Sequence, residues 1–430
     1  MNRRSFLQGS VVGAATAAAA PLSAAVASAR LPSDQLRVAV VGVNGRGKSH
    51  LKGFAASPDT VVTTVCDVDL NVAAGAQKLL EEAGAPKPKV VQDIRRVLDD
   101  KEIDIVSIAT PDHWHALGAI WACQAGKDVY VEKPVSHNVS EGRRVVEAAR
   151  KYDRIVQAGT QSRSIPAMQD AIKFLRDGGI GKVYMAKALC YKRRKSIGRT
   201  PETATPDGVD YNLWLGPAPE RPYSRNRFHY NWHWMWDYGT TDMGNQGIHQ
   251  MDIARWGIGK HELPRKIHGT GAKFVYDDDQ ETPNTQVSTF EYDDVLLVFE
   301  VRGLLTNDEK GVKVGNLFYG SDGYLTIGGD GWKTYLGEKG EPGPAGTEKE
   351  YGNHFQNFID AVKKRDHTLL TADILEGHLS SALCHLGNVS YRTRRKLTFD
   401  PSWENFPGDD EANSYLTRRY RKPFVVPEAV

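Results

Sequence analysis

The sequence is poor in cysteine, in long apolar runs and in net charge. Its four cysteines lack the paired spacing of a disulfide framework or of a zinc site, so no metal is predicted. We expect Cys66, Cys123, Cys190 and Cys384 to be core or isolated thiols. No apolar run after residue 30 is long enough to span a bilayer. A net charge of +2 gives no general attraction to nucleic acid.

The chain is long enough for two domains, with 430 residues of which 40% are hydrophobic and 25% charged. Residues 1–29 are set apart from the fold. Arg3 and Arg4 precede a mild Ala/Gly/Val stretch and a small-residue site at Ala27-Ser28-Ala29, which resembles a twin-arginine export signal. A disordered alanine-rich leader is the alternative. The signal implies a periplasmic or otherwise exported protein, carried across the membrane already folded with its cofactor.

A glycine-rich turn follows the first strand-length apolar run, Val38–Val41. It spells G-x-N-G-x-G, and its expected cofactor contacts are Gly42, Asn44, Gly45, Arg46 and Gly47. Asparagine stands where the dinucleotide fingerprint usually has its second glycine. Such a turn lets backbone N–H groups and a helix N-terminus approach a pyrophosphate, although glycine-rich turns also serve as plain structural turns.

Asp67 ends the second apolar run, where an acid holds an adenosine ribose. A carboxylate there repels a 2′-phosphate, so NAD is predicted as the preferred cofactor. Arg46 leaves room for NADP.

Strands and helices keep alternating up to residue 160. Helices are expected over 71–83, from 93, over 115–125 and over 140–152, with strands over 104–109, 127–131 and 155–158. The pattern predicts a parallel, doubly wound Rossmann domain over residues 36–160. Ligands bind at the carboxyl ends of such strands. The residues expected to contact the cofactor there are Thr110, Pro111, His113, His115, Glu132, Lys133 and Gln161.

The remainder predicts an α+β domain over 161–400 with an open antiparallel sheet. Its strands are expected over 183–191, 266–276, 285–292, 295–301, 316–320 and 323–327, and its helices over 167–177, 352–364 and 371–392. An extended tail covers 401–430. The basic run 192–195 is interpreted as a solvated loop, with acid or phosphate binding as the alternative.

The aromatic-rich segment 214–236 has the length and composition of a loop that covers a substrate, although an oligomer arm has the same features. Its aromatic and basic side chains fit a sugar platform and a packed loop core equally well. They are Arg227, His229, Trp232, His233, Trp234 and Trp236.

Several of these motifs occur together in one order: Gly42–Gly47, Asp67, Thr110-Pro111, Glu132-Lys133-Pro134 and Gly247-Ile248-His249. In this respect the chain resembles the Gfo/Idh/MocA family, named for glucose–fructose oxidoreductase, inositol dehydrogenase and a rhizopine catabolism protein. The resemblance covers about residues 36 to 400. It implies a first domain that binds NAD or NADP and a second domain whose open sheet makes subunit contacts, hence a homo-oligomer.

The resemblance also assigns roles in the site. Lys133 matches the family's active-site lysine, and an ammonium there can stabilise a developing alkoxide. His249 matches the family's histidine, which can accept the hydroxyl proton. Many sugar dehydrogenases of the family have an aspartate where this chain has Asn245, so the proton route is open, with Asp242 and Asp237 as nearby candidates to share it. Lys133, Arg163, Trp236 and His249 are expected to bind substrate.

Three functions follow from the sequence. The first is an NAD(P)-dependent oxidoreductase with a tightly bound cofactor, acting on a sugar, glycoside or polyol. The second is a redox-neutral glycosidase or lyase that oxidises the sugar transiently and eliminates the leaving group. The third is an exported dinucleotide sensor without chemistry, against which the retained Lys133 and His249 argue.

Overall fold

The structure is a computed structural model that describes residues 35–347 and 352–430. The expected export signal, residues 1–29, lies outside the described residues. In the part of the chain that is described, no helix is long and apolar enough to cross a membrane. Nor does any group of three or more His, Cys, Asp or Glu side chains in that part lie where it could hold a metal ion. All four cysteines are buried and free, as expected of core thiols.

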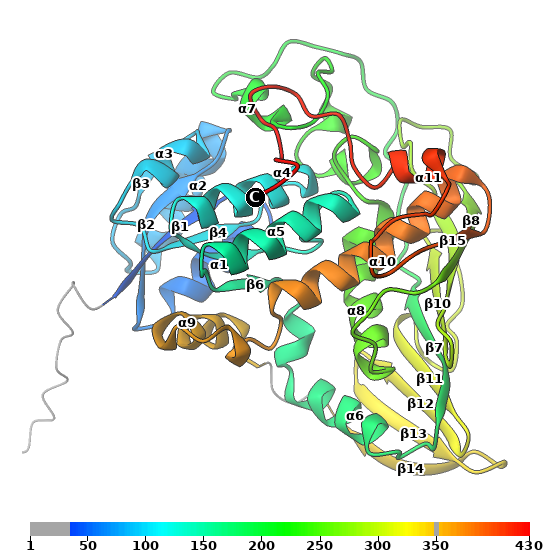
Figure 1. Ribbon diagram of the computed structural model, residues 1–430. Coiled ribbons are helices and arrows are strands. Elements are labelled where there is room, and N and C mark those ends of the chain that lie inside the picture. Colours follow the sequence, from blue (N-terminus) through cyan, green and yellow to red (C-terminus); the bar gives the residue numbers. More distant parts are fainter. Residues whose placement is uncertain (1–34, 348–351) are drawn as a thin grey trace, which may run out of the picture. The chain divides into compact units, whose positions relative to one another are not determined.

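Six parallel strands form the first sheet, in the spatial order β3-β2-β1-β4-β5-β6 (Figure 1). The strands are β1 Leu36–Val41, β2 Thr60–Cys66, β3 Lys89–Val91, β4 Ile105–Ile108, β5 Asp128–Val131 and β6 Val156–Ala158. Alternate residues of β1 enter different cores: Val38 and Val40 face one, Ala39 and Val41 the other. Both faces are therefore covered, which is why the strands are apolar throughout. The predicted Rossmann fold is confirmed.

Helices connect these strands and cover both faces of the sheet. They are α1 Gly47–Ala55, α2 Leu70–Glu82, α3 Ile94–Asp99, α4 Asp112–Gln124 and α5 Val139–Lys151. Helix α4 begins at Asp112 rather than at the expected His115, because Pro111 occupies the N-cap, where its missing N–H costs nothing. The Asp112–His115 stretch is thereby helical, which decides which of its side chains face the pocket.

Two late segments complete the core around the first sheet. Phe358 and Ile359 of α9 (His354–Lys364) pack in the same core as Val38 and β2. Phe424 of the C-terminal tail is buried in the core beneath α4, and the red end of the chain runs beside that helix in Figure 1. The tail also contains α11 (Asp410–Ser414), so the expectation of a wholly extended tail was wrong. The domain boundary near residue 160 stays a prediction.

The second sheet has nine strands, in the order β14-β13-β12-β11-β7-β10-β9-β8-β15. They are β7 Val183–Cys190, β8 Lys266–Ala272, β9 Thr285–Glu291, β10 Leu296–Arg302, β11 Val314–Gly320, β12 Gly323–Gly328, β13 Gly331–Leu336, β14 Glu341–Gly346 and β15 Leu397–Thr398. The sheet is mixed rather than antiparallel, because β7 pairs in parallel with β10. The long connection after β7 makes such a parallel pair possible. Strands β13 and β14 were not predicted: β14 reads EPGPAG, a composition tolerated only at an edge.

Three helices cover one face of the second sheet: α6 Pro166–Arg176, α8 Ile248–Gly257 and α10 Ile374–Thr393. A π-helical turn, Met243–Gly247, leads directly into α8. This turn and the start of α8 carry Asn245 and His249, two of the residues of the second domain that reach the pocket.

Candidate functional site

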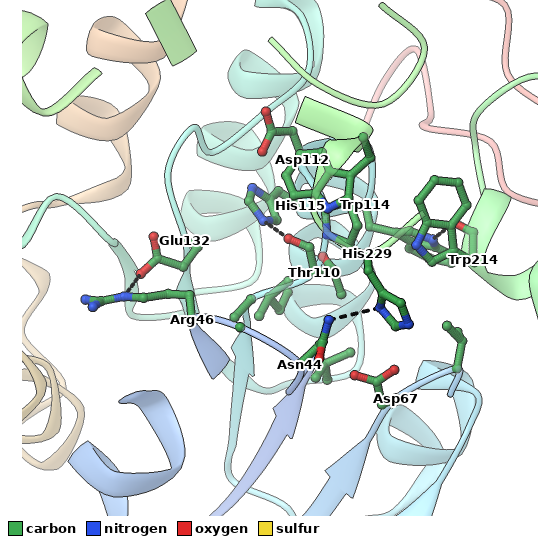
Figure 2. A pocket seen from close by; sticks show the side chains of 18 of the residues that line it. Asn44, Arg46, Asp67, Thr110, Asp112, Trp114, His115, Glu132, Trp214 and His229 are labelled. Atoms are coloured by element: carbon green, nitrogen blue, oxygen red, sulfur yellow. Dashed lines mark hydrogen bonds and ion pairs between the residues drawn. The ribbon is translucent and has the colours of Figure 1, made fainter. Parts of the chain in front are cut away.

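A pocket of about 390 Å³ lies at the carboxyl ends of the central strands of the first sheet. Its walls include the ends of β1 and β2 on one side and of β4 and β5 on the other, so it sits at the point where the strand order reverses. Segment 214–236, here called the cover loop, and the Met243–His249 region close it from the second domain. Figure 2 shows Asn44 and Asp67 facing Thr110 and Trp214 across this pocket.

The glycine-rich turn is tightly packed. Gly42 has φ +81°, and a Cβ there would lie 2.7 Å from the Ala109 carbonyl oxygen and the Thr110 nitrogen. A Cβ on Gly47 would lie 1.9 Å from the Gly42 carbonyl oxygen. Gly42 lines the pocket but Gly47 does not. The position of Gly47 serves helix–strand packing, and its cofactor contact stays a prediction. Gly45 borders open space.

Asp67 ends β2 at the pocket wall. Its carboxylate accepts hydrogen bonds from the backbone N–H groups of Val43 (2.8 Å) and Asp69 (3.0 Å). Burial raises the pKa of Asp67 to about 6. Each carboxylate oxygen keeps a second lone pair for a ribose hydroxyl. Across the pocket, Thr110 Oγ1 is buried without a partner among the described residues. These features fit a bound dinucleotide.

Glu132, which directly follows β5, is the centre of a cluster of polar and charged side chains. Its Oε1 accepts from Arg46 Nε (3.0 Å) and Gln161 Nε2 (2.9 Å), and His50 Nε2 lies 3.1 Å away. Although burial opposes ionisation, His50, Arg46 and Lys133 hold the pKa of Glu132 well below its usual value. Arg46, Gln161 and Glu132 line the pocket as expected. Sequence reasoning missed His50, because a buried histidine on α1 carries no motif.

Thr110, Pro111 and His115 line the pocket, but His113 does not. His113 Nε2 donates to the Trp214 carbonyl oxygen at 2.8 Å, away from the cavity, and Trp114 faces the cavity instead. Because α4 begins at Asp112, both residues lie in its first turn and their side chains point in different directions. The ring nitrogens of His115 face the carbonyl oxygens of Thr110 (2.8 Å) and Pro134 (2.6 Å), which joins the ends of β4 and β5.

Lys133, Asn245 and His249 meet at the far end of the pocket. Lys133 Nζ donates to the Asn245 backbone oxygen at 2.7 Å. His249 is partly buried, and its Nδ1 is fully buried without a partner among the described residues. Burial, reinforced by the charge of Lys133, lowers the pKa of His249 to about 4. The imidazole is therefore neutral at pH 7 and able to accept a proton.

The sequence run 245–256 predicts an α-helix that would bring Asn245 and His249, four residues apart, onto one face, but the structure shows no pairing of these side chains in the described part of the chain. Asn245 lies in the π-helical turn and His249 in α8, so the four-residue spacing of an α-helix does not apply. Among the described contacts, none is a hydrogen bond between these side chains. The two alternative carboxylates are engaged elsewhere: Asp242 pairs with Arg194 (2.6 Å) and Asp237 with Arg221 (2.9 Å). Arg194 is thus a structural anchor rather than part of a solvated basic loop.

Two residues expected to bind substrate lie outside the pocket. Arg163 is buried beneath α8, where Asp252 (2.8 Å) and Glu376 (3.0 Å) bind its guanidinium. Trp236 stacks on Tyr391 and receives the guanidinium of Arg392 on its ring, beside a separate small cavity. Tertiary ion pairs and stacking engage both side chains outside the pocket, and the substrate contacts expected of them stay predictions.

The cover loop is both a packed core and a pocket wall. Trp214, Phe228, Trp232 and Met235 form a hydrophobic cluster with Leu215, Ala218 and Tyr238. The same segment also lines the pocket, with Trp214, Phe228, His229, Tyr230, Trp232 and His233. The packed loop core is therefore present, and the sugar platform stays a prediction. Phe228 and Tyr230 were not singled out in the sequence.

Two family models match the chain. One, described as "Oxidoreductase family, NAD-binding Rossmann fold", matches residues 36–160. The other, described as "Oxidoreductase family, C-terminal alpha/beta domain", matches residues 183–426. The first domain is thus an NAD-binding Rossmann domain.

Relatives of known name match over shorter stretches. A "Glycosyl hydrolase family 109 protein 2" of Shewanella sp. (strain ANA-3) is 35% identical over 172 residues, covering 36% of this chain and 38% of that protein. The levoglucosan dehydrogenase of Pseudarthrobacter phenanthrenivorans is 30% identical over 151 residues, covering 34% and 39%. These alignments span well under half of either relative.

A solved structure agrees over most of the fold. The WlbA dehydrogenase from Bordetella pertussis, in complex with NADH and UDP-GlcNAcA, has a TM-score of 0.63 at 18% identity. The match covers 85% of this chain and 99% of that one. It extends over both sheets of the described chain and shows that the two proteins share a fold.

Proposed function

Because the chain belongs to the Gfo/Idh/MocA family of nicotinamide-dependent oxidoreductases, we propose that it oxidises a hydroxyl group of a sugar, glycoside or polyol. One observation carries the proposal: Lys133 and His249 share a single pocket with the glycine-rich turn and Asp67. A proton acceptor and a cation thus lie at one end, with a dinucleotide cradle at the other. NAD, when bound, supplies the hydride acceptor.

The chain's own residues have complementary roles in this reaction. Neutral His249 accepts the hydroxyl proton, because its pKa of about 4 leaves the imidazole unprotonated at pH 7. The Lys133 ammonium, held by the Asn245 carbonyl oxygen, stabilises the alkoxide that develops. The aromatic rings of Tyr230 and Trp232 supply the apolar surface on which a sugar ring stacks.

A second candidate is redox-neutral cleavage of a glycoside, favoured by the relatives named glycosyl hydrolases. Oxidation of one ring hydroxyl to a ketone acidifies the neighbouring C–H bond. Loss of that proton expels the aglycone from the next carbon, water adds to the resulting double bond, and return of the hydride restores the hydroxyl. The sum is hydrolysis, and the same Lys133 and His249 serve every proton transfer.

Export and cofactor retention belong to the same proposal. We expect the twin-arginine signal to carry the folded protein to the periplasm with NAD inside, and the protein to act there as a homo-oligomer. Since no pool of free NAD is expected outside the cytoplasmic membrane, each cycle has to regenerate the cofactor in place. This requirement favours glycoside cleavage or a second sugar as hydride acceptor over ordinary dehydrogenation.

The test is to incubate dialysed protein with glycosides and free sugars, with and without added NAD. Mass spectrometry follows the products, and absorbance follows reduced nicotinamide. Oxidised sugar accumulating with reduced nicotinamide supports the dehydrogenase, and repeated cleavage without added NAD supports the second candidate. Turnover that survives Lys133→Ala would overturn both. Activity that scales with millimolar free NAD would contradict cofactor retention.

A further inference from the structure

A three-residue contact joins the cover loop to the nucleotide-binding turn. Asn44 Nδ2 donates to His229 Nδ1 at 2.9 Å, drawn as a dashed line in Figure 2. The other ring nitrogen, His229 Nε2, lies 3.2 Å from Asp69 Oδ2. One neutral tautomer satisfies both contacts, with the proton on Nε2 and the lone pair on Nδ1. His229 therefore bridges the ends of β1 and β2.

The geometry of this bridge is fixed from both sides. His229 has φ +54°, a left-handed conformation that is uncommon for residues other than glycine. Asp69 caps α2 by accepting from the N–H groups of Asn71 and Val72, so its carboxylate cannot swing freely. Asn44 stands where the dinucleotide fingerprint usually has glycine, so its side chain is additional to what pyrophosphate binding needs.

The first residue of the cover loop, Trp214, is held differently from His229. The Trp214 carbonyl oxygen accepts from His113 Nε2 (2.8 Å) and Trp114 Nε1 (3.1 Å), and all three residues are buried. The His229 side chain, in contrast, is 41% exposed. The loop thus spans the pocket from α4 to β1 and β2. Its contact with α4 is buried, whereas the His229 side chain that contacts the ends of β1 and β2 is solvent-accessible, although its neighbours Phe228 and Trp232 are packed in the hydrophobic cluster of the loop. Exposed hydrogen bonds open at lower cost than buried ones.

We propose that the Asn44–His229–Asp69 contact is a latch that controls release of the dinucleotide. The inference rests on the proposed function, since it presupposes that NAD occupies the pocket. With the latch closed, the loop crosses the strand-order reversal where a dinucleotide lies. Opening it, while the Trp214 anchor stays in place, uncovers the adenosine end next to Asp67. The latch supplies the retention that an exported NAD enzyme needs.

The test measures how fast NADH leaves the loaded protein when excess NAD is added, by loss of NADH fluorescence. His229→Ala removes both contacts and is expected to release NADH about tenfold faster. Asn44→Gly removes one contact and restores the usual glycine, so release accelerates less while binding survives. The double variant is expected to be no faster than His229→Ala, because both changes break the same bridge.

Arg227→Ala is the matched control. Arg227 lies two residues away in the cover loop and binds Glu202 and the Pro222 carbonyl oxygen, without touching the nucleotide-binding turn. Release that is unchanged in His229→Ala, or equally fast in Arg227→Ala, overturns the latch while leaving the proposed function intact. Failure of the unmodified protein to bind NADH at all overturns both.

Discussion

The Asp67 end and the Lys133 end of the pocket are formed by different kinds of structure. The Asp67 end consists of strand termini and backbone: Gly42 approaches the chain at Ala109 and Thr110 closely, and backbone N–H groups hold the Asp67 carboxylate. The Lys133 end depends on side chains from the second domain, among them His249 of α8. The backbone of the first end is specified within the Rossmann domain. The second exists only once two distant parts of the chain have packed together.

This difference separates binding from chemistry. A change at the Asp67 end is expected to alter which dinucleotide binds and how tightly, because the groups that face a ribose lie there. A change at the Lys133 end is expected to alter turnover while binding persists. A single substitution that altered both dinucleotide binding and turnover would contradict this separation of the two ends.

The largest effect is expected from Lys133→Ala. Removing the only cation that touches the Asn245 carbonyl oxygen among the described contacts takes away the charge that stabilises the alkoxide, so kcat falls by about 100- to 1,000-fold. NADH binding, measured by fluorescence titration, is expected to stay within a few-fold. Lys192→Ala is the matched control, since Lys192 binds Gln246 of the same helical turn outside the pocket. Near-normal turnover in Lys133→Ala would place the chemistry elsewhere.

A smaller effect, confined to binding, is expected from Asp67→Asn. The pKa of Asp67 is about 6, and only the carboxylate accepts two ribose hydrogen bonds well. NAD affinity of the unmodified protein should therefore be highest above pH 6 and fall as the pH drops through that value, by at most about tenfold per unit. In Asp67→Asn this pH dependence disappears and the preference for NAD over NADP shrinks.

Isothermal titration between pH 5 and 8 with both dinucleotides checks this result. Asp99→Asn, an exposed change on α3, controls for lost charge. An unchanged NADP affinity together with an unchanged pH profile would mean that Asp67 does not face the ribose.

The sequence predicts the Asp67 end better than the Lys133 end, for a physical reason. Parallel strands deliver whatever follows them to one edge, so apolar runs alone place Asp67, Thr110 and Lys133 there. The direction of a side chain is set by its tertiary partners, and the spacing of residues in the sequence does not reveal those partners. For that reason the ion pairs of Arg163 with Asp252 and Glu376 were not predicted. The Gly- and Pro-rich strand β14 was missed because such a composition forms a strand only at the edge of a sheet.

The smallest effect is expected from a change at Asn245, for which the four-residue spacing of an α-helix predicted the wrong neighbour. Asn245→Asp adds a carboxylate to the pocket wall, and a negative charge raises the pKa of a nearby imidazole. Since the π-helical turn leaves Asn245 and His249 without a hydrogen bond, we expect the rise to be smaller than the one to three units that a contacting opposite charge produces. We expect the acid limb of the pH profile of kcat/KM near pH 4 in the unmodified protein, and it should therefore move upward only slightly in the variant. Gln246→Glu is the matched control, because it adds the same charge one residue away, beside Lys192 and outside the pocket, and should leave the limb in place. A shift of more than about one unit in Asn245→Asp would mean that this side chain touches His249 in the working enzyme, and the two ends would then differ less than the structure indicates.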